Sequence, residues 1–146
     1  MNLSTMLFSF TGRINRARYW LAVLAVGVVG TLVVVLGIAL EIGRAYPATI
    51  AIGVAVVLAL AWIDLAVSVK RLHDRDKSAW WLLLFYVVPA AILPVLGLLG
   101  NRSANLILGS VRAGIGIWAF VEIACLRGTP GPNRYGSDPL QVQGAA

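Results

Sequence analysis

The chain has 146 residues, of which 60% are apolar and only 12% are charged, and its mean hydropathy is +0.87. Soluble globular domains are roughly 45–50% apolar and about 25% charged. The twelve basic and six acidic residues, with a net charge of +6, are too few to cover a folded core in water. The composition therefore excludes a soluble globular domain and indicates a protein solvated by a lipid bilayer.

Four apolar segments are long enough to cross a bilayer as helices, since a span needs roughly 20 apolar residues at ~1.5 Å rise each. Barrel strands of ~9–11 residues would alternate polar and apolar side chains, and these segments do not. Pro89 and Pro94 predict a kink or an irregular stretch in the third segment. We therefore expect an all-α membrane protein, a four-helix transmembrane bundle with spans at residues 19–40, 47–69, 79–100 and 105–126.

Shorter features lie at both ends of this single membrane domain, which we place at residues 1–139. Four apolar residues near the N-terminus follow the i, i+3, i+4, i+7 spacing of a short helix lying on the membrane surface: Leu3, Met6, Leu7 and Phe10. Residues 128–139 are rich in glycine and proline, which predicts a turn-rich loop. We expect a flexible tail at residues 140–146.

Basic residues cluster at one side of the predicted spans, and Lys and Arg near helix ends favour the cytoplasm. Nine of them fall before the first span, after the second and after the fourth: Arg13, Arg16, Arg18, Lys70, Arg71, Arg75, Lys77, Arg127 and Arg134. The other two connections contain only Arg44 and Arg102. The distribution predicts that both termini and the 70–78 turn face the cytoplasm.

The segment "KRLHDRDKSAWW", residues 70–81, contains the only histidine of the chain and two aspartates. Two interpretations stay open. Lys and Arg offer hydrogen-bond donors to phosphate, and histidine titrates near neutral pH, so the segment can form a specific anion or headgroup site. Alternatively, the basic residues fix topology and attract anionic lipid at about 1 kcal/mol each. Topology requires neither histidine nor aspartate, which favours a specific fold of this segment.

Three motifs, "GRINRARYW", "VKRLHDRDKSAWW" and "LRGTPGPNRYGSDP", resemble the hallmark motifs of the DUF805 family, in order from Phe8 to Pro139. The resemblance implies a small multi-pass protein of the bacterial inner membrane without an established biochemical activity. This chain has Asp76 and Ala79 where the family usually has glycine. A residue with a side chain at position 76 argues against a turn of positive φ there.

We expect the three motifs to meet as one cytoplasmic cluster, with Arg13 and Arg71 near its centre and the C-terminal motif packed over it. The candidate ligand- or headgroup-binding residues are Arg13, Arg16, Lys70, Arg71, His73, Asp74, Arg75, Asn133 and Tyr135. No catalytic residue, cofactor or metal is predicted. A single His–Asp pair lacks a second group of metal ligands, and no serine or cysteine has an evident base beside it.

Two carboxylates, Asp64 and Glu122, fall inside predicted spans, about 6–8 Å from the end that carries the basic motifs. Unpaired charges are costly there, so we favour ion pairs with Arg13, Arg16 or Arg71. The alternative is a proton or ion pathway, because intramembrane carboxylates often serve transport.

The predicted function is a non-enzymatic binding or interaction module at the cytoplasmic leaflet. Its expected partners are anionic lipid headgroups, a second copy of the chain or another membrane protein, and not nucleic acid. Two alternatives remain: a small ion- or solute-translocating bundle that uses Asp64 and Glu122, and a lipid-headgroup or phosphate-modifying enzyme centred on His73.

Overall fold

The structure, a computed structural model, describes residues 2–39, 47–98 and 100–141. The expected loop residue Arg44 and residues 142–146 of the expected flexible tail lie outside these ranges. The described elements are helices, with η denoting a π-helix: α1 Leu3–Phe8, α2 Arg16–Ala39, α3 Pro47–Asp74, η1 Leu83–Val87, α4 Val88–Leu98, α5 Arg102–Phe120 and η2 Val121–Cys125. Within the described residues, the all-α prediction is confirmed.

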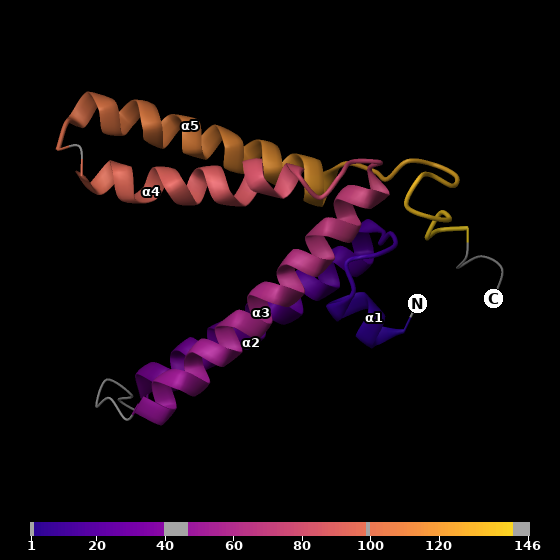
Figure 1. Ribbon diagram of the computed structural model, residues 1–146, viewed down its shortest axis with the longest axis horizontal. Helices are drawn as coiled ribbons and strands as arrows, with labels where there is room; N and C mark the ends of the chain where they lie inside the picture. The colour runs from indigo at the N-terminus through magenta and orange to yellow at the C-terminus, as the bar shows by residue number, and fades with distance from the viewer. Residues whose placement is uncertain (1, 40–46, 99, 142–146) are drawn as a thin grey trace.

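The chain forms two long helical hairpins that diverge from a common end (Figure 1). One hairpin pairs α2 with α3, the other pairs α4 with α5, and the hairpins meet where α2 and α3 contact η2. This arrangement differs from the single four-helix bundle that the sequence predicted. Lipid chains solvate apolar side chains as well as protein does, so apolar character alone does not force four membrane helices together.

Three helical stretches are long and apolar enough to cross a membrane: Arg16–Ile38, Ile50–Asp74 and Arg102–Cys125. The third predicted span forms a shorter apolar helix, Leu83–Leu98. Its first five residues, Leu83–Val87, are π-helical, and the amide of Val88 donates to the carbonyl of Leu83, five residues back. Pro89 has no N–H and so cannot donate the backbone hydrogen bond that a regular α-helix would have at this position. This π-helix is the irregular stretch that the prolines predicted.

Three asparagines begin helices by capping free amides. The side-chain oxygen of Asn2 accepts from the amide of Thr5 at 2.9 Å, that of Asn15 from Arg18 at 3.0 Å, and that of Asn101 from Ser103 and Ala104 at 2.9 and 3.2 Å. The short N-terminal helix α1 packs against α3. There, the Phe10 and Trp62 rings meet edge to face with their centroids 4.9 Å apart.

The helix α3 continues to Asp74, beyond the predicted end at residue 69, so the second motif begins within the helix and not in a turn. Lys, Arg and Leu favour helices, and Arg71 and His73 lie in the last turn, where the helix dipole favours positive charge. Asp76 then adopts a φ of +56°. The expectation that a non-glycine residue would prevent a positive-φ turn is therefore wrong; aspartate is one of the few residues that tolerate this conformation.

The buried side chains gather at the end where the hairpins meet. This end, named the junction here, comprises residues 10–20, 66–86 and 121–138. Its apolar core includes Ile14, Val67, Leu72, Phe85 and Ile123. By contrast, most side chains farther along α2, α4 and α5 are exposed, as expected for surfaces in contact with lipid.

Candidate functional site

A buried carboxylate, Asp74, pairs with two arginines at the centre of the junction. Its Oδ1 accepts a hydrogen bond from Nε of Arg13 at 3.1 Å and lies 3.0 Å from Nη2 of the same side chain. Its Oδ2 pairs with Nη1 of Arg71, one helical turn earlier. The three side chains are at most 5% exposed. Each charge here depends on its partners, because an uncompensated buried charge is strongly destabilising. These residues form the arginine–aspartate cluster.

Arg71 joins the two hairpins. Its Nε donates to the carbonyl of Ile123 at 2.9 Å, and its Nη2 donates to the carbonyl of Leu126. These carbonyls lie where η2 ends and where a helix leaves acceptors without amide partners. The planar guanidinium thus connects α3 to η2 while it neutralises Asp74, which the single ammonium of lysine could not do with the same geometry.

Arg13 draws the C-terminal segment, residues 126–141, over the cluster. Its Nη1 donates to the carbonyl of Gly131 at 2.7 Å, and its Nη2 donates to that of Thr129 at 2.6 Å. The amide of Thr129 in turn donates to the carbonyl of Asp74 at 2.8 Å, which closes the end of α3. A Cβ at Gly128 would overlap the Asp74 carboxylate. The close approach of the segment therefore requires glycine at this position.

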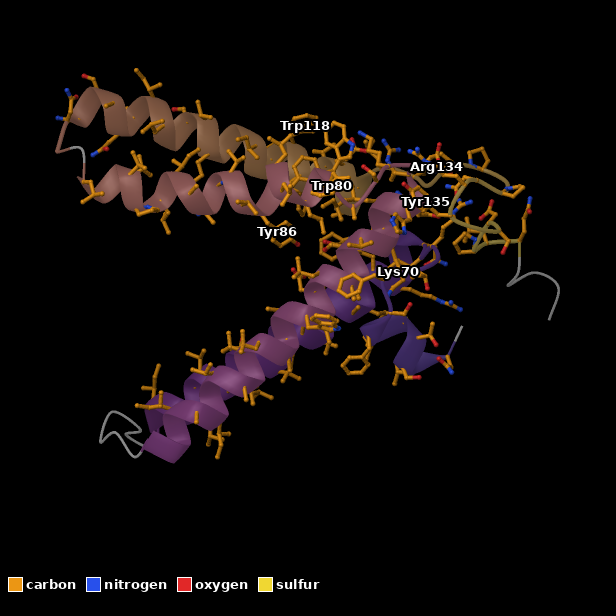
Figure 2. All side chains as sticks on the ribbon, viewed as in Figure 1. Lys70, Trp80, Tyr86, Trp118, Arg134 and Tyr135 are labelled. Atoms are coloured by element: carbon orange, nitrogen blue, oxygen red, sulfur yellow. The ribbon has the colours of Figure 1, made fainter. Side chains whose placement is uncertain are left out.

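His73 lies between the first and third motifs. Its ring stacks on that of Tyr135, with centroids 3.8 Å apart and planes 4° from parallel, and Figure 2 shows Tyr135 beside the end of α3. Its Nδ1 is 3.3 Å from the carbonyl oxygen of Gly12, and Nδ2 of Asn133 donates to its backbone carbonyl at 2.9 Å. Adjacent helical side chains diverge by ~100°, so the imidazole points away from the neighbouring carboxylate. It serves here as a packing surface.

Glu122 pairs with residues of the second motif and not with the arginines proposed from sequence. Its Oε1 lies 2.9 Å from Nη2 of Arg75 and 3.2 Å from Nζ of Lys77. The Lys77 ammonium also lies 4.2 Å from the centroid of the Trp81 ring. The ion-pair partners of Glu122 in the structure are therefore residues that follow α3.

The predicted ion pair of Asp64 is corrected by the structure. The hydroxyl of Tyr86 donates to Oδ2 of Asp64 at 2.9 Å and lies 3.1 Å from the hydroxyl of Ser68. In Figure 2, Tyr86 extends from η1 toward α3. The Asp64 carboxylate thus supplies the Tyr86 hydroxyl with a hydrogen-bond partner within the apolar helices. Within the described residues, no ion pair joins Asp64 to the arginines that the sequence suggested: Arg13, Arg16 and Arg71.

Lys70 is fully buried and anchors α1. Its ammonium donates to the carbonyl of Ser9 and, at 3.4 Å, to that of Thr5. Both carbonyls lie at the C-terminal end of α1, where the helix dipole attracts a positive charge. This candidate binding residue therefore holds the N-terminal helix to α3, and its ammonium lies apart from the arginine–aspartate cluster.

A cavity of about 1130 Å³ lies beside the arginine–aspartate cluster. Charged and aromatic side chains of its lining include Arg16, Trp20, Arg71, Asp74, Arg127 and Asp138. It is bounded by the start of α2, the end of η2 and the C-terminal segment, and its lining contains three arginines and two carboxylates. We call this space the headgroup cavity, after the headgroup-binding role that the sequence suggested for residues of its lining.

Two exposed arginines border the headgroup cavity. Arg16 donates through Nη1 to the carbonyl of Cys125 at 2.9 Å, and beside it the indole of Trp20 donates to the carbonyl of Ala124 at 3.3 Å. The Arg127 guanidinium makes no hydrogen bond or ion pair to the part of the chain that the structure describes. Its donors are therefore available to a ligand in the cavity.

Asp138, another residue of the cavity lining, is held by backbone amides. The amide of Leu140 donates to its Oδ1 at 2.9 Å, and that of Gly131 donates to its Oδ2 at 3.0 Å. These two hydrogen bonds, aided by the charge of Arg13, hold the pKa of the Asp138 carboxyl below its usual value. The carboxylate fixes the turn-rich loop and so shapes the cavity.

Residues 7–137 match the family model described as "Protein of unknown function (DUF805)". The chain belongs to the DUF805 family. It is 31% identical over 130 residues to the inner membrane protein YhaI of Escherichia coli K12, a match that covers 89% of this chain and 85% of YhaI. The inner membrane protein YhaH of the same strain is 33% identical over 135 residues, covering 89% and 86%. No solved structure matches the chain.

The uncharacterized protein YiiR of E. coli K12 is 30% identical over 151 residues, which cover 98% of this chain and 94% of YiiR. The matches extend over nearly the whole chain, so they concern the entire membrane domain. Together with the apolar helices, they identify this DUF805 member as a multi-pass inner-membrane protein.

Most residues at the centre of the junction were predicted from the sequence, but two charged residues of the cavity lining were not. Six predicted residues meet at or beside the cluster: Arg13, Arg71, His73, Asp74, Asn133 and Tyr135. Arg127 and Asp138 were not predicted as site residues. Both lie inside the third motif, and Arg127 also belongs to the basic residues that the sequence placed on the cytoplasmic side, so these two signals could have found them. Across the described residues, no group of three or more His, Cys, Asp or Glu side chains could hold a metal ion.

Proposed function

We propose that this DUF805 protein is a non-enzymatic binding module that holds a phosphate-bearing anion at the cytoplasmic leaflet. The observation that carries the proposal is the headgroup cavity, which is bordered by the exposed guanidiniums of Arg16 and Arg127. Arginine matches phosphate with paired donors in one plane. Two exposed guanidiniums beside a buried charge network support a role in binding and require no catalytic group.

The charges around the cavity favour an anion. The lining has three arginines against two carboxylates. Asp74 is already paired with two buried arginines, and Asp138 accepts two backbone amides. The charges of Arg16 and Arg127 therefore face the cavity with little opposition. Trp20 lies one turn of α2 after Arg16 and before the apolar part of the helix, and indoles prefer the membrane interface.

The proposal includes four membrane crossings with both termini in the cytoplasm. Residues 81–98 are helical and extend ~27 Å, close to the ~30 Å hydrocarbon thickness, so this shorter element also suffices to cross. The basic residues of all three motifs gather at the junction, which supports its cytoplasmic placement. Reporter fusions at residues 75 and 140 should be cytoplasmic, and one at residue 103 periplasmic. A periplasmic signal at residue 75 would reverse the orientation.

Transport and catalysis have less support. Asp64 is hydrogen-bonded to Tyr86, Glu122 is paired with two basic side chains, and neither carboxylate lines the headgroup cavity. His73 is stacked on Tyr135 and is also absent from the lining. A translocation pathway through the carboxylates, or an enzyme centred on His73, would need these groups to face a site for the transported or reacting molecule.

Lipid retention by the purified protein tests the proposal. Native mass spectrometry of protein supplied with equal amounts of phosphatidylglycerol and phosphatidylcholine should detect preferential retention of the anionic lipid. Arg127→Gln and Arg16→Gln should each lower that retention about tenfold. Arg112→Gln is the matched control, because it removes the same charge from an exposed position on α5 away from the cavity. Equal losses in all three variants would mean that only total charge matters, and the proposal would fail.

A further inference from the structure

We propose that the anion in the headgroup cavity is part of an intact phospholipid whose acyl chain lies along α2. This inference rests on the function proposed above and assigns its ligand class. Its basis is a second, apolar groove on α2, lined by Val23, Leu24, Gly27, Val28, Thr31 and Leu32. The headgroup cavity and this groove provide separate surfaces for the two chemically different halves of one lipid.

The cavity and the groove share one face of α2. The helix contributes Arg16 and Trp20 to the cavity, and the groove continues through Leu24, Gly27 and Thr31. Steps of three or four residues keep side chains on the same side of a helix. A ligand whose phosphate contacts Arg16 can therefore extend along α2 without crossing to another face.

The length of this face fits one leaflet. Eleven residue steps separate Trp20 from Thr31, which correspond to ~16 Å of helix. Half of a ~30 Å hydrocarbon core is ~15 Å, the depth that one acyl chain fills. The polar end of the face then lies at the headgroups, and the apolar end lies near the middle of the bilayer.

The groove is open and apolar. A Cβ added at Gly27 would meet no atom within 4 Å, so the missing side chain leaves unfilled space. The hydroxyl of Thr31 donates to the carbonyl of Gly27 at 2.8 Å, which satisfies the one polar side chain of the lining. Trp20 packs on Phe120 with ring centroids 6.0 Å apart, and beyond this contact the two hairpins diverge (Figure 1). A lipid chain suits this uncovered face.

The experiment compares Gly27→Leu, which fills the groove, with Gly37→Leu, the matched control farther along α2. An added Cβ meets no neighbour at either glycine, so both variants should fold. Each is supplied with dioleoyl phosphatidylglycerol and, separately, with dihexanoyl phosphatidylglycerol, whose chains are too short to reach Gly27. Native mass spectrometry measures the retained lipid, and Tm in detergent measures the response to the short-chain form.

We expect Gly27→Leu to retain about tenfold less dioleoyl lipid than Gly37→Leu, because apolar contact along the groove is lost. The Tm response to the dihexanoyl lipid should be equal in the two variants, since the headgroup cavity is unchanged. Equal retention of the dioleoyl lipid would overturn the acyl-chain assignment and leave the proposed function intact. If Arg127→Gln binds both lipids as the parent does, the proposed function fails as well.

Discussion

The carboxylate of Asp74 occupies the space in which a side chain at Gly128 would begin. The same carboxylate pairs with Arg13 and Arg71, so the C-terminal segment contacts the centre of a buried charge network. Arg13 then donates to backbone carbonyls of that segment. One aspartate thus sets the positions of two arginines, the end of α3 and the wall of the headgroup cavity.

Gly128→Ala should destabilise the fold, because the added methyl group forces either Asp74 or the C-terminal segment to move. We expect a loss of roughly 1–3 kcal/mol, the usual cost of overpacking, seen as a lower Tm in detergent. Gly116→Ala is the control, since a Cβ there meets nothing within 4 Å. If the two variants melt at the same temperature, the close approach at Gly128 has no energetic importance.

Asp74→Asn should be far more damaging than Asp76→Asn. The first change leaves two buried guanidiniums without a counter-charge, which typically costs ~3–5 kcal/mol. The second weakens an ion pair to Arg134 whose side chains are 45% and 61% exposed, where such pairs contribute ~0–1 kcal/mol. Denaturant or thermal unfolding in detergent compares them. Equal losses of stability in the two variants would show that the arginine–aspartate cluster contributes no more to stability than an exposed ion pair does.

Arg71→Lys tests the geometry of the guanidinium without a change in net charge. Lysine cannot reach Asp74 and the carbonyls of Ile123 and Leu126 together, so we expect a loss of roughly 2–4 kcal/mol from buried acceptors without donors. Arg75→Lys is the matched control, because its partly exposed pair with Glu122 accepts an ammonium. Its cost should stay within about 1 kcal/mol. If Arg71→Lys and Arg75→Lys have the same Tm, the basic residues of the second motif act only in setting membrane topology.

The meeting of the three motifs could be predicted because each motif mixes charges with hydrogen-bonding groups that topology does not require. Arg13 and Arg71 are central, as expected, because arginine is suited to satisfying several acceptors at once. The extension of α3 through Asp74 was missed because charged residues after an apolar span suggest a loop. Tertiary hydrogen bonds from Thr129 and Asn133 instead close a longer helix.

The partners of the intramembrane carboxylates could not be found from sequence. Asp64 accepts a hydrogen bond from Tyr86 of η1. The residues around Tyr86 are almost all apolar, so the sequence pattern does not show which side of this helix would carry a polar contact. The pairing of Glu122 with Arg75 depends on the path of the chain after α3. Nor could composition predict two diverging hairpins, since an apolar helix side is equally compatible with lipid and with another helix.

Lys70→Met should release α1 while the longer helices stay folded. Methionine keeps much of the volume and the flexible stem but removes the donors to the carbonyls of Ser9 and Thr5. Amide hydrogen exchange should therefore rise in residues 3–10 and stay unchanged in the middle of α3. Lys77→Met, which alters a partly exposed lysine away from α1, provides the comparison. Unchanged protection of α1 in Lys70→Met would contradict the anchoring role.

Asp138→Asn should lower stability in a pH-dependent way. Amide donors from Leu140 and Gly131 depress the pKa of Asp138 in the folded protein, so the charged carboxylate stabilises the fold above its unfolded pKa of about 3.9. That contribution is lost as the pH falls through the lower, folded pKa. The variant should therefore melt below the parent at neutral pH, and the Tm difference should shrink toward about pH 3. A difference that stays constant over this range would show that the charge of Asp138 does not stabilise the loop.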